Sequence, residues 1–337
     1  MDIKEVSYTK DEYNESLLTL NIKGEYAVYQ ILNSIRQSAI DQPYIYAYDV
    51  SQIKIIKNTT VYDVTETKLR LSQLPIYNIE QFEQAELSNE LSNEYYGDGQ
   101  NKQDGQNEQN KQNEQNELII ETYAKKKNNT LNNIYVTTND LIVKINNKLI
   151  DNDKMYPKDN PTALSILRSN EELEFSMKTM LKTGEQNAIY NASSCFWTQI
   201  NDNEYIFKMK CNEQRNPYLI LATVCDIING KLRNLKVNFT NKQYKMMTYG
   251  KNKLIIEICN ENYVTFGPIN YMLQNMNDII KSGISKISYL EKKMLLSFET
   301  HKNDPLDNLF EAIDLSIGIY DKFKEKILKI YNDKYLK

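Results

Sequence analysis

The order strand, helix, strand, strand, helix can be read twice along this chain. The first copy contains the alternating apolar residues Leu18, Leu20 and Ile22 and is interrupted by a long insertion between Lys57 and Asn203. The second copy runs without interruption from about Leu254 to the C-terminus. A single layer of such elements leaves one apolar face uncovered, so a chain that repeats the unit is typically built to pair the two copies.

In the first copy, an apolar stripe at helical spacing predicts a helix over Glu25–Asp41. Pro43 ends this helix, because the residue before a proline avoids the helical region. The Tyr- and Ile-rich stretch 44–56 predicts the next strand, and alternation resumes over 205–209. Asn216-Pro217 predicts the start of the second helix, since a capping side chain is followed by proline at the first helical position.

In the second copy, alternation predicts strands over 254–258 and 294–298. Between them, an apolar stripe that includes Ile280 predicts a helix over Gly267–Lys281. Asp304-Pro305 opens a last helix that would be about 48 Å long if it continued to Tyr335. A helix of this length needs a partner for its apolar stripe.

The predicted fold class is α+β, with two β-α-β-β-α units paired within one chain and a mixed, mainly β insert domain in the first. We predict three domains: residues 1–56 with 204–245, the insert 57–203, and residues 246–337. Within the insert, residues 97–117 form a Gln/Asn/Glu/Lys repeat with no apolar residue to bury, and we expect a disordered loop there.

Composition excludes several classes of protein. The 41 basic and 45 acidic residues give a net charge of −4, whereas a protein held mainly by phosphate contacts is expected to be more basic. No stretch approaches the roughly 18–20 apolar residues that span a bilayer, and the N-terminus lacks the apolar core of a signal peptide. We therefore expect an intracellular protein without a membrane partner.

No catalytic or metal-binding pattern is present in the sequence. His301 is the only histidine, and neither a nucleophile elbow nor a phosphate loop occurs. The four cysteines, Cys195, Cys211, Cys225 and Cys259, lack the spacing of a zinc or redox site. We predict no catalytic residue, no metal and no cofactor.

The stretch 231–253 carries seven basic residues and no acidic one, with Tyr244 and Tyr249 interleaved. Basic and aromatic residues alternate in this way in proteins that bind single-stranded nucleic acid. The alternative interpretation is a solvated helix end followed by the linker that joins the two copies.

In the first copy, Asn33-Ser34-Ile35-Arg36 is followed by Pro43. This run resembles the Asn-x-Leu-Arg-Arg…Pro signature of the α-like subunits of cellular RNA polymerases, namely the bacterial α subunit, the archaeal D subunit and their eukaryotic counterparts. The segment 69–76, Leu-Arg-Leu-Ser-Gln-Leu-Pro-Ile, resembles His-Arg-Leu-Gly-Leu-Ile-Pro-Leu, and 185–190 resembles Glu-His-Ala-Lys-Phe/Trp. The segment from 216 to 232 is similar to the helix that closes the family's dimerisation unit.

The second copy resembles the smaller archaeal L-type partner. The matching segments are Thr265-Phe266-Gly267, the stretch 288–293 and Asp304-Pro305-Leu306. Three departures stand out: Gln37 replaces the second Arg, Pro268 replaces Asn, and no cysteines follow Pro75, where eukaryotic relatives bind zinc.

The resemblance implies a fused D/L-type subunit of a multisubunit DNA-directed RNA polymerase, typical of a large nucleocytoplasmic DNA virus. Such a subunit is a non-catalytic assembly platform that docks the second-largest subunit and joins the largest and the small assembly subunits. It implies no direct DNA contact and no homodimer, and a place in the cytoplasmic virus factory or the virion. The alternatives are a free-standing nucleic-acid-binding protein and a structural virion protein.

Two sets of site residues are predicted, the first from the resemblance and the second from the apolar stripes of the two predicted helices. The predicted large-subunit contact is formed by Asn33, Arg36, Pro43, Arg70 and Pro75. The predicted intrachain pairing packs Ile31, Leu32 and Ile35 against Ile269, Met272 and Met276.

Overall fold

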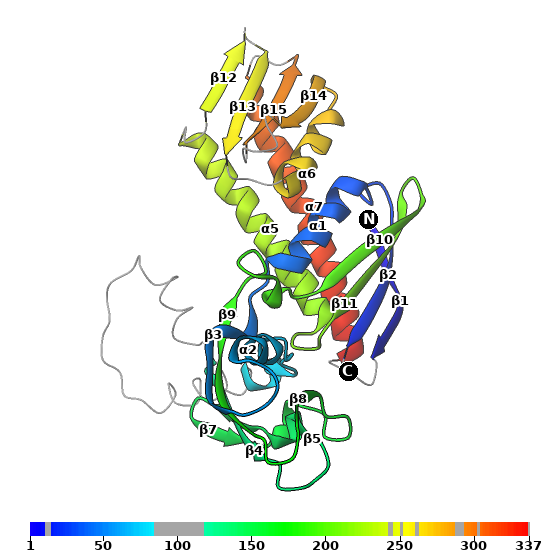
Figure 1. Cartoon of the computed structure of the whole chain (residues 1–337). Helices are drawn as coiled ribbons and strands as arrows, with labels where there is room; N and C mark the ends of the chain where they lie inside the picture. The colour runs from blue at the N-terminus through cyan, green and yellow to red at the C-terminus, as the bar shows by residue number, and fades with distance from the viewer. Residues whose placement is uncertain are drawn as a thin grey trace, which may run out of the picture.

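The computed structural model describes residues 1–10, 15–83, 118–241, 245–249, 252–259, 263–286, 293–301 and 304–335. It shows an α+β protein whose sheets are antiparallel (Figure 1). The Gln/Asn-rich tract 97–117 lies outside the described residues. Over the part of the chain that is described, no helix is both long and apolar enough to cross a membrane.

The first four-stranded sheet has the order β1-β2-β11-β10. Its strands are β1 (Asp2–Lys10), β2 (Ser16–Lys23), β10 (Ser194–Asn201) and β11 (Glu204–Cys211). Two helices belong to this unit, α1 (Tyr29–Asp41) and α5 (Pro217–Thr240). Alternate residues of β2 and β11, such as Leu20 and Phe207, are fully buried on the helix side of the sheet. We call this assembly the first unit.

The second four-stranded sheet has the order β12-β13-β15-β14. Its strands are β12 (Lys245–Tyr249), β13 (Lys253–Cys259), β14 (Ile279–Lys286) and β15 (Lys293–Thr300). Its helices are α6 (Tyr263–Gln274) and α7 (Pro305–Tyr335). This second unit therefore repeats the first as β-β-α-β-β-α, with the same strand order in the sheet.

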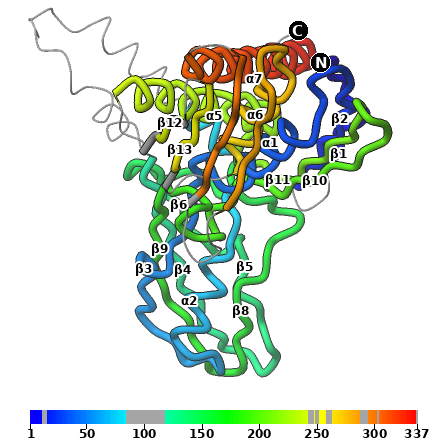
Figure 2. The backbone as a smooth tube through the Cα atoms, turned by 90° about the horizontal axis from the view of Figure 1, so that it is seen from above, coloured from blue at the N-terminus to red at the C-terminus, as the bar shows by residue number. Residues whose placement is uncertain are grey.

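The insert lies between α1 and β10 and contains a five-stranded sheet of order β3-β9-β4-β6-β7. Its strands are β3 (Ile45–Asn58), β4 (Ile120–Lys127), β6 (Ile142–Ile145), β7 (Lys148–Ile150) and β9 (Glu172–Lys182). The hairpin-like pair β5 (Ile134–Thr137) and β8 (Ala163–Leu167) and the helix α2 (Val64–Ser72) complete the domain. The insert has its own hydrophobic core, and it projects away from helices α5, α6 and α7 (Figure 2).

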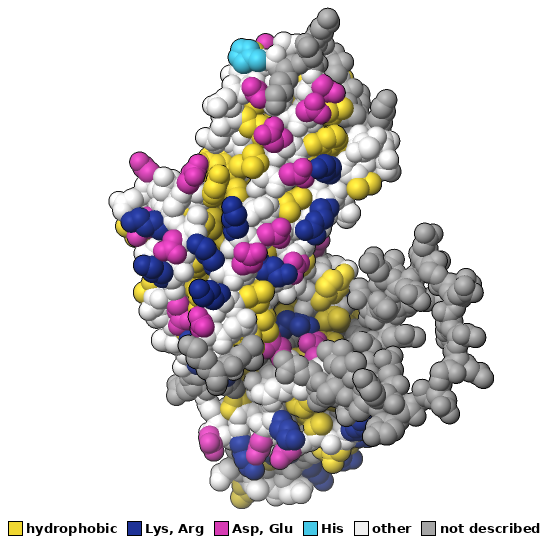
Figure 3. All heavy atoms as spheres, turned by 180° about the vertical axis from the view of Figure 1, so that it is seen from behind, with side chains coloured by type: hydrophobic (Ala, Val, Ile, Leu, Met, Phe, Trp, Pro, Cys, Tyr) yellow, Lys and Arg dark blue, Asp and Glu magenta, His cyan; other side chains and the backbone are white. Residues whose placement is uncertain are grey.

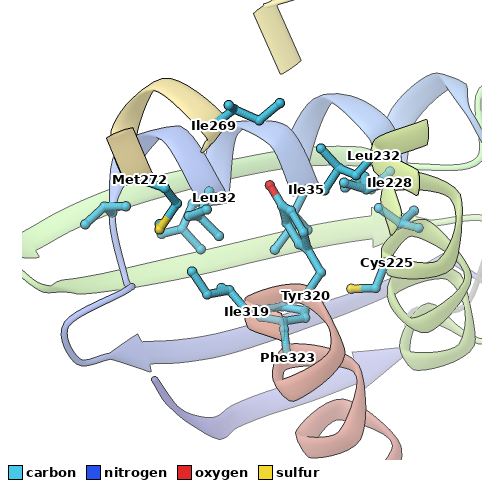
Figure 4. Close-up of a cluster of buried hydrophobic side chains, with 14 of the residues drawn as sticks. Leu32, Ile35, Cys225, Ile228, Leu232, Ile269, Met272, Ile319, Tyr320 and Phe323 are labelled. Atoms are coloured by element: carbon cyan, nitrogen blue, oxygen red, sulfur yellow. The ribbon is translucent and has the colours of Figure 1, made fainter. Parts of the chain in front are cut away.

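The first and second units share one hydrophobic core. Helix α1 packs against α6, and α5 packs against α7, so the four helices form the layer between the two sheets. Buried residues of both units, from Leu18 to Ile327, belong to this single cluster. Figure 4 shows its centre, where Tyr320 of α7 extends toward Ile35 of α1.

One strand was assigned to the wrong sheet. The strand predicted over 44–56 is present as β3, but it pairs with β9 in the insert sheet and not with the first unit. Its place beside β11 is taken by β10, which the sequence analysis had included in the insert. Local alternation identifies a strand, but strand partners lie far away along the chain, and this accounts for the error.

The helix predicted over Gly267–Lys281 is also corrected. Helix α6 starts earlier, at Tyr263, and ends at Gln274, so Met276 and Ile280 lie outside it. The residues Asn275–Asp278 form a turn, and Ile280 is part of β14. The apolar spacing of 269, 272, 276 and 280 fits a helix, but the Asn- and Asp-rich turn overrides it.

Other predictions agree with the structure more closely. Helix α5 starts at Pro217 with the Asn216 side chain accepting a bond from the Tyr218 amide at 3.1 Å, and α7 spans Pro305–Tyr335 as expected. Helix α1 begins at Tyr29, four residues later than predicted, because Gly24 and Ala27 form a turn before it. The stretch 231–253 contains the end of α5 and strand β12, so it is only in part a linker.

Candidate subunit-docking surface

The titratable groups that could carry chemistry are dispersed. His301 is exposed at a bend after β15, and Cys195, Cys211 and Cys225 are buried free thiols. Burial raises the pKa of the Cys195 thiol to about 12, so the reactive thiolate is disfavoured. Among the residues that the structure describes, no group of three or more His, Cys, Asp and Glu side chains could hold a metal ion.

Two residues of the predicted large-subunit contact lie together on α1. The guanidinium of Arg36 donates through Nε at 3.2 Å and through Nη2 at 3.0 Å to Oδ1 of Asn33, one turn earlier. Asn33 is buried, whereas Arg36 is half-buried. The buried amide of Asn33 thus fixes the orientation of the Arg36 guanidinium, a group that binds carboxylates through charge-assisted hydrogen bonds.

Arg36 lines a polar groove of about 630 Å³ between the two units. The groove, which we call the α1 groove, is bounded by the C-terminal half of α1, by α5 and by the start of α6. Besides Arg36, its charged side chains are Asp41, Glu185 and Lys231. Burial raises the pKa of Asp41, and the nearby Glu185 carboxylate adds to the shift. The groove therefore presents both signs of charge on a partly dehydrated surface.

The C-terminus of α1 is held by the segment that connects β9 to β10. The amides of Glu185 and Ala192 donate to the carbonyls of Asp41 and Ile40, at 3.2 and 2.9 Å. The Ser193 hydroxyl donates to the Ala39 carbonyl at 2.6 Å. These bonds satisfy carbonyl groups that have no partner within the last turn of a helix. They also fix the insert relative to the α1 groove.

Gly184 is required by the close approach of this segment to α1. A Cβ atom at position 184 would lie 2.2 Å from Oδ1 of Asn191 and 2.8 Å from Cα of Asp41. The second distance involves backbone, which cannot move aside as a flexible side chain can. No pattern in the sequence marks this glycine, because the contact is made across the fold.

The other three predicted contact residues lie apart from Arg36. Pro43 is buried just after α1. Arg70 is on α2, where it pairs with Glu66 at 3.0 Å and its guanidinium carbon lies 4.0 Å above the ring centre of Tyr62. Pro75 lines a second polar groove, of about 520 Å³, between the insert and the first unit. The structure thus brings Asn33 and Arg36 together and places Arg70 and Pro75 on other parts of the surface.

The second groove contains a residue that the sequence analysis missed. The Gln214 side chain accepts a bond from the Tyr46 amide and donates to the Tyr46 carbonyl, both at 2.8 Å. It thereby satisfies both polar backbone groups at one position on the edge strand β3, as a neighbouring strand would. Gln214 is itself buried, so it joins the first unit to the insert at the base of this groove.

The residues predicted to pair the two units meet in the shared core. Ile31, Leu32, Ile35 and Ile269 are fully buried, and Met272 is 4% exposed. Met276 is partly buried at the margin of the same cluster. Figure 4 shows Ile269 and Met272 on α6 beside Leu32 and Ile35 of α1.

A hydrogen bond inside the helix layer also links the units. Pro268 lies within α6 and has no amide hydrogen, so it cannot donate to the carbonyl of Val264 four residues earlier. The hydroxyl of Ser34, fully buried on α1, donates to that carbonyl at 2.8 Å. The proline in one unit thus leaves an acceptor that the serine in the other unit satisfies.

Polar pairs fix the register of α5 against α7. Lys324 binds Asp226 and Asn229 binds Asp321, each at 2.7 Å, and further along the pair Lys236 binds Asp314 at 2.7 Å. As the residue number rises along α5, the number of its partner on α7 falls by the same amount, so the two helices are antiparallel. Lys231 in turn donates to Gln42. Lys231 and Lys236 of the basic stretch 231–253 are therefore engaged within the chain.

Comparison with known proteins shows a similarity to a viral protein. The chain is 25% identical over 338 aligned residues to a protein of Acanthamoeba polyphaga mimivirus that is provisionally named as a DNA-directed RNA polymerase subunit. The similarity covers 93% of this chain and 90% of that protein. No protein-family model matches the chain.

Proposed function

We propose that this chain is a subunit of a viral DNA-directed RNA polymerase, in which it combines a D-like and an L-like half in one polypeptide. The observation that carries the proposal is the similarity, over nearly the whole length, to the mimivirus protein named as a polymerase subunit. The duplicated units with identical strand order and a shared core support the fused D/L assignment.

In this proposal the chain is an assembly platform, and catalysis resides in the largest and second-largest subunits. The first unit comprises residues 1–44 and 194–241, the insert 45–193, and the second unit 245–335. The units pair within one chain, so the protein needs no second copy of itself. We further propose that small assembly subunits join the same complex and that the chain makes no direct DNA contact. It would act in the cytoplasmic virus factory, and in the virion if the polymerase is packaged.

We place the contact with the second-largest subunit at the α1 groove, with Arg36 as its central charge. The support is the oriented guanidinium of Arg36 and the mixed charges of the groove. Because Pro75 and Arg70 lie elsewhere, the contact would extend from the α1 groove over the insert. Pro43 and Asn33 are buried and would act indirectly. Pro43 would stabilise the end of α1, and Asn33 would orient Arg36 on the face of that helix.

Affinity purification of the tagged chain from its native cells tests the proposal. We expect the largest and second-largest polymerase subunits to co-purify in stoichiometric amounts. The variant Arg36→Glu should reduce their recovery at least tenfold, whereas Arg233→Glu, an exposed arginine on α5, should not. Recovery of the chain without polymerase subunits would contradict the function, and full recovery with Arg36→Glu would contradict only the contact site.

Sedimentation of the purified chain tests the intrachain pairing. One copy per particle is expected, because the apolar faces of α1 and α6 already cover each other. A stable dimer that dissociates when Met272 is changed to Lys would show that the units pair between chains.

A further inference from the structure

The second unit carries an apolar groove along the outer side of α7. It has a volume of about 510 Å³ and is lined by Tyr26, which precedes α1, and by successive turns of α7 from Asp307 to Lys322. Figure 3 shows the face behind that of Figure 1, where hydrophobic side chains form a band bordered by acidic and basic ones. We call this feature the α7 groove.

The floor of the α7 groove has room for a partner. Phe310 and Tyr26 are only partly buried against the shared core, and Leu315 is 45% exposed. Gly318 lies between these turns, and among the described residues no heavy atom lies within 4 Å of a Cβ atom built at that position. Glycine is among the poorest helix formers. Its missing side chain leaves the helix backbone open to close approach from outside.

Acidic and basic side chains lie at opposite ends of the α7 groove. Asp307, Glu311 and Asp314 lie at the end where α7 begins, and Lys322 lies at the other end. Asp314 is already paired with Lys236 at 2.7 Å. The groove is therefore acidic at the N-terminal end of α7 and basic at the far end. A helix lying antiparallel to α7 would place its C-terminal turn at the acidic end, and basic residues are favoured in that turn.

The α1 groove is a separate feature. It is lined by the C-terminal half of α1, by α5 and by the start of α6, whereas the α7 groove is lined by α7 and by the residue before α1. The α1 groove is polar, and the α7 groove is apolar with charged ends. One repeated architecture thus offers two different surfaces on its two sides.

We propose that the α7 groove is a docking site for an amphipathic helix of another protein, bound antiparallel to α7. The apolar face of this helix would cover Phe310, Leu315 and Gly318. Its C-terminal turn would carry Lys or Arg opposite Asp307, and its first turn an acidic residue opposite Lys322. This docking site goes beyond the proposed function and does not depend on it, because it concerns a face of the chain that the contact at Arg36 does not use.

Two stapled helical peptides of 18 residues, labelled with fluorescein, test the proposal on the full chain. Both carry leucines at positions i, i+4, i+7 and i+11. The first has Glu in its first turn and Lys in its last, and the second has these charges exchanged. Fluorescence anisotropy should show that the first peptide binds at least tenfold more tightly than the second. Equal affinities, or no binding of either peptide, would overturn the proposal.

Matched glycine variants locate the binding site. Gly318→Leu fills the groove and should weaken binding of the first peptide at least tenfold. Gly230→Leu is the control, since Gly230 lies in α5 and also has open space around a built Cβ atom. Unchanged binding to Gly318→Leu, or an equal loss with Gly230→Leu, would refute the site. Concentration-dependent self-association that Gly318→Leu abolishes would identify a second copy of the chain as the occupant and would also refute the proposal.

Discussion

The hydrogen bond from Ser34 to the Val264 carbonyl allows the link between the two units to be measured. In Ser34→Ala the hydroxyl is lost, and the carbonyl of Val264, a partly buried residue at the edge of the α1 groove, loses this donor. A fully buried acceptor left without a partner costs about 1–3 kcal/mol, so this partly buried carbonyl should cost about 1 kcal/mol. Removing one oxygen atom opens little space, so a cavity contributes much less than the lost bond.

Pro268 makes the prediction specific. Pro268→Ala restores an amide hydrogen at position 268, which can donate to the Val264 carbonyl four residues earlier as in a regular helix. Ser34→Ala should therefore cost much less in the Pro268→Ala background than in the natural chain. The expected coupling energy between the two changes is about 1 kcal/mol or more.

Urea unfolding followed by circular dichroism provides the assay, with the midpoint and slope compared across the four proteins of the cycle. Ser316→Ala is a matched control, because Ser316 is equally buried but its hydroxyl donates within its own helix, to Ala312. The control should shift the midpoint less than Ser34→Ala. Equal costs of Ser34→Ala with and without Pro268 would refute the proposed exchange of donors.

Three further changes probe the insert and its connection to the first unit. Partial burial raises the pKa of the Asp49 carboxyl. The hydrogen bonds that it accepts from Ser51, Lys182 and Tyr190 outweigh this effect and hold the pKa well below its usual value near 4. The Asp49 carboxylate therefore stabilises the folded chain above about pH 4, and this contribution is lost as the pH falls further. Asp49→Asn should lower the melting temperature at pH 7 and reduce the further fall of the melting temperature in acid. A fall in acid as large as that of the natural chain would contradict the role of Asp49. Gly184→Ala should destabilise by roughly 1–3 kcal/mol in urea unfolding because its Cβ would meet the backbone of Asp41, whereas Gly283→Ala, with open space around it, serves as the control. Gln214→Leu leaves the amide and carbonyl of Tyr46 without this partner and should cost about 2 kcal/mol or more; a melting temperature within 1 °C of the natural chain would argue against the bridge.

Elements with strong local signals could be predicted from the sequence. The start of α5 is determined by Asn216 and Pro217, and α7 by a long apolar stripe after Asp304. Strand β1 was missed because it is an edge strand with a bulge between Glu5 and Ser7, and Ile3 is its one buried residue. Strand β14 was missed because the turn at 275–278 interrupts a run of apolar residues that also fits a helix. Local periodicity is weakest where burial is partial.

The candidate site was predictable only where its residues are near one another in the sequence. Asn33 and Arg36 are one helical turn apart, so their contact follows from the helix itself. Gln214 and Tyr46 meet across 168 positions, and no spacing rule predicts such a contact. The Ser34 bond had one visible signal, the proline inside an otherwise helical stretch, which marks a carbonyl that needs a donor from elsewhere.

The shared core explains why the two units behave as one body. The apolar faces of α1 and α6 lie in one cluster, so separating the units would expose fully buried side chains such as Ile31 and Ile269 to water. Each such side chain contributes on the order of 1.5–3 kcal/mol when buried. Helix α5 ends at Thr240 and β12 starts at Lys245, so the connection is short and pairing is intramolecular. A short connection gives an effective concentration around millimolar, which favours pairing within the chain over pairing between chains. The α1 groove and the α7 groove then keep a fixed geometry, because the helices that line them are part of the same core.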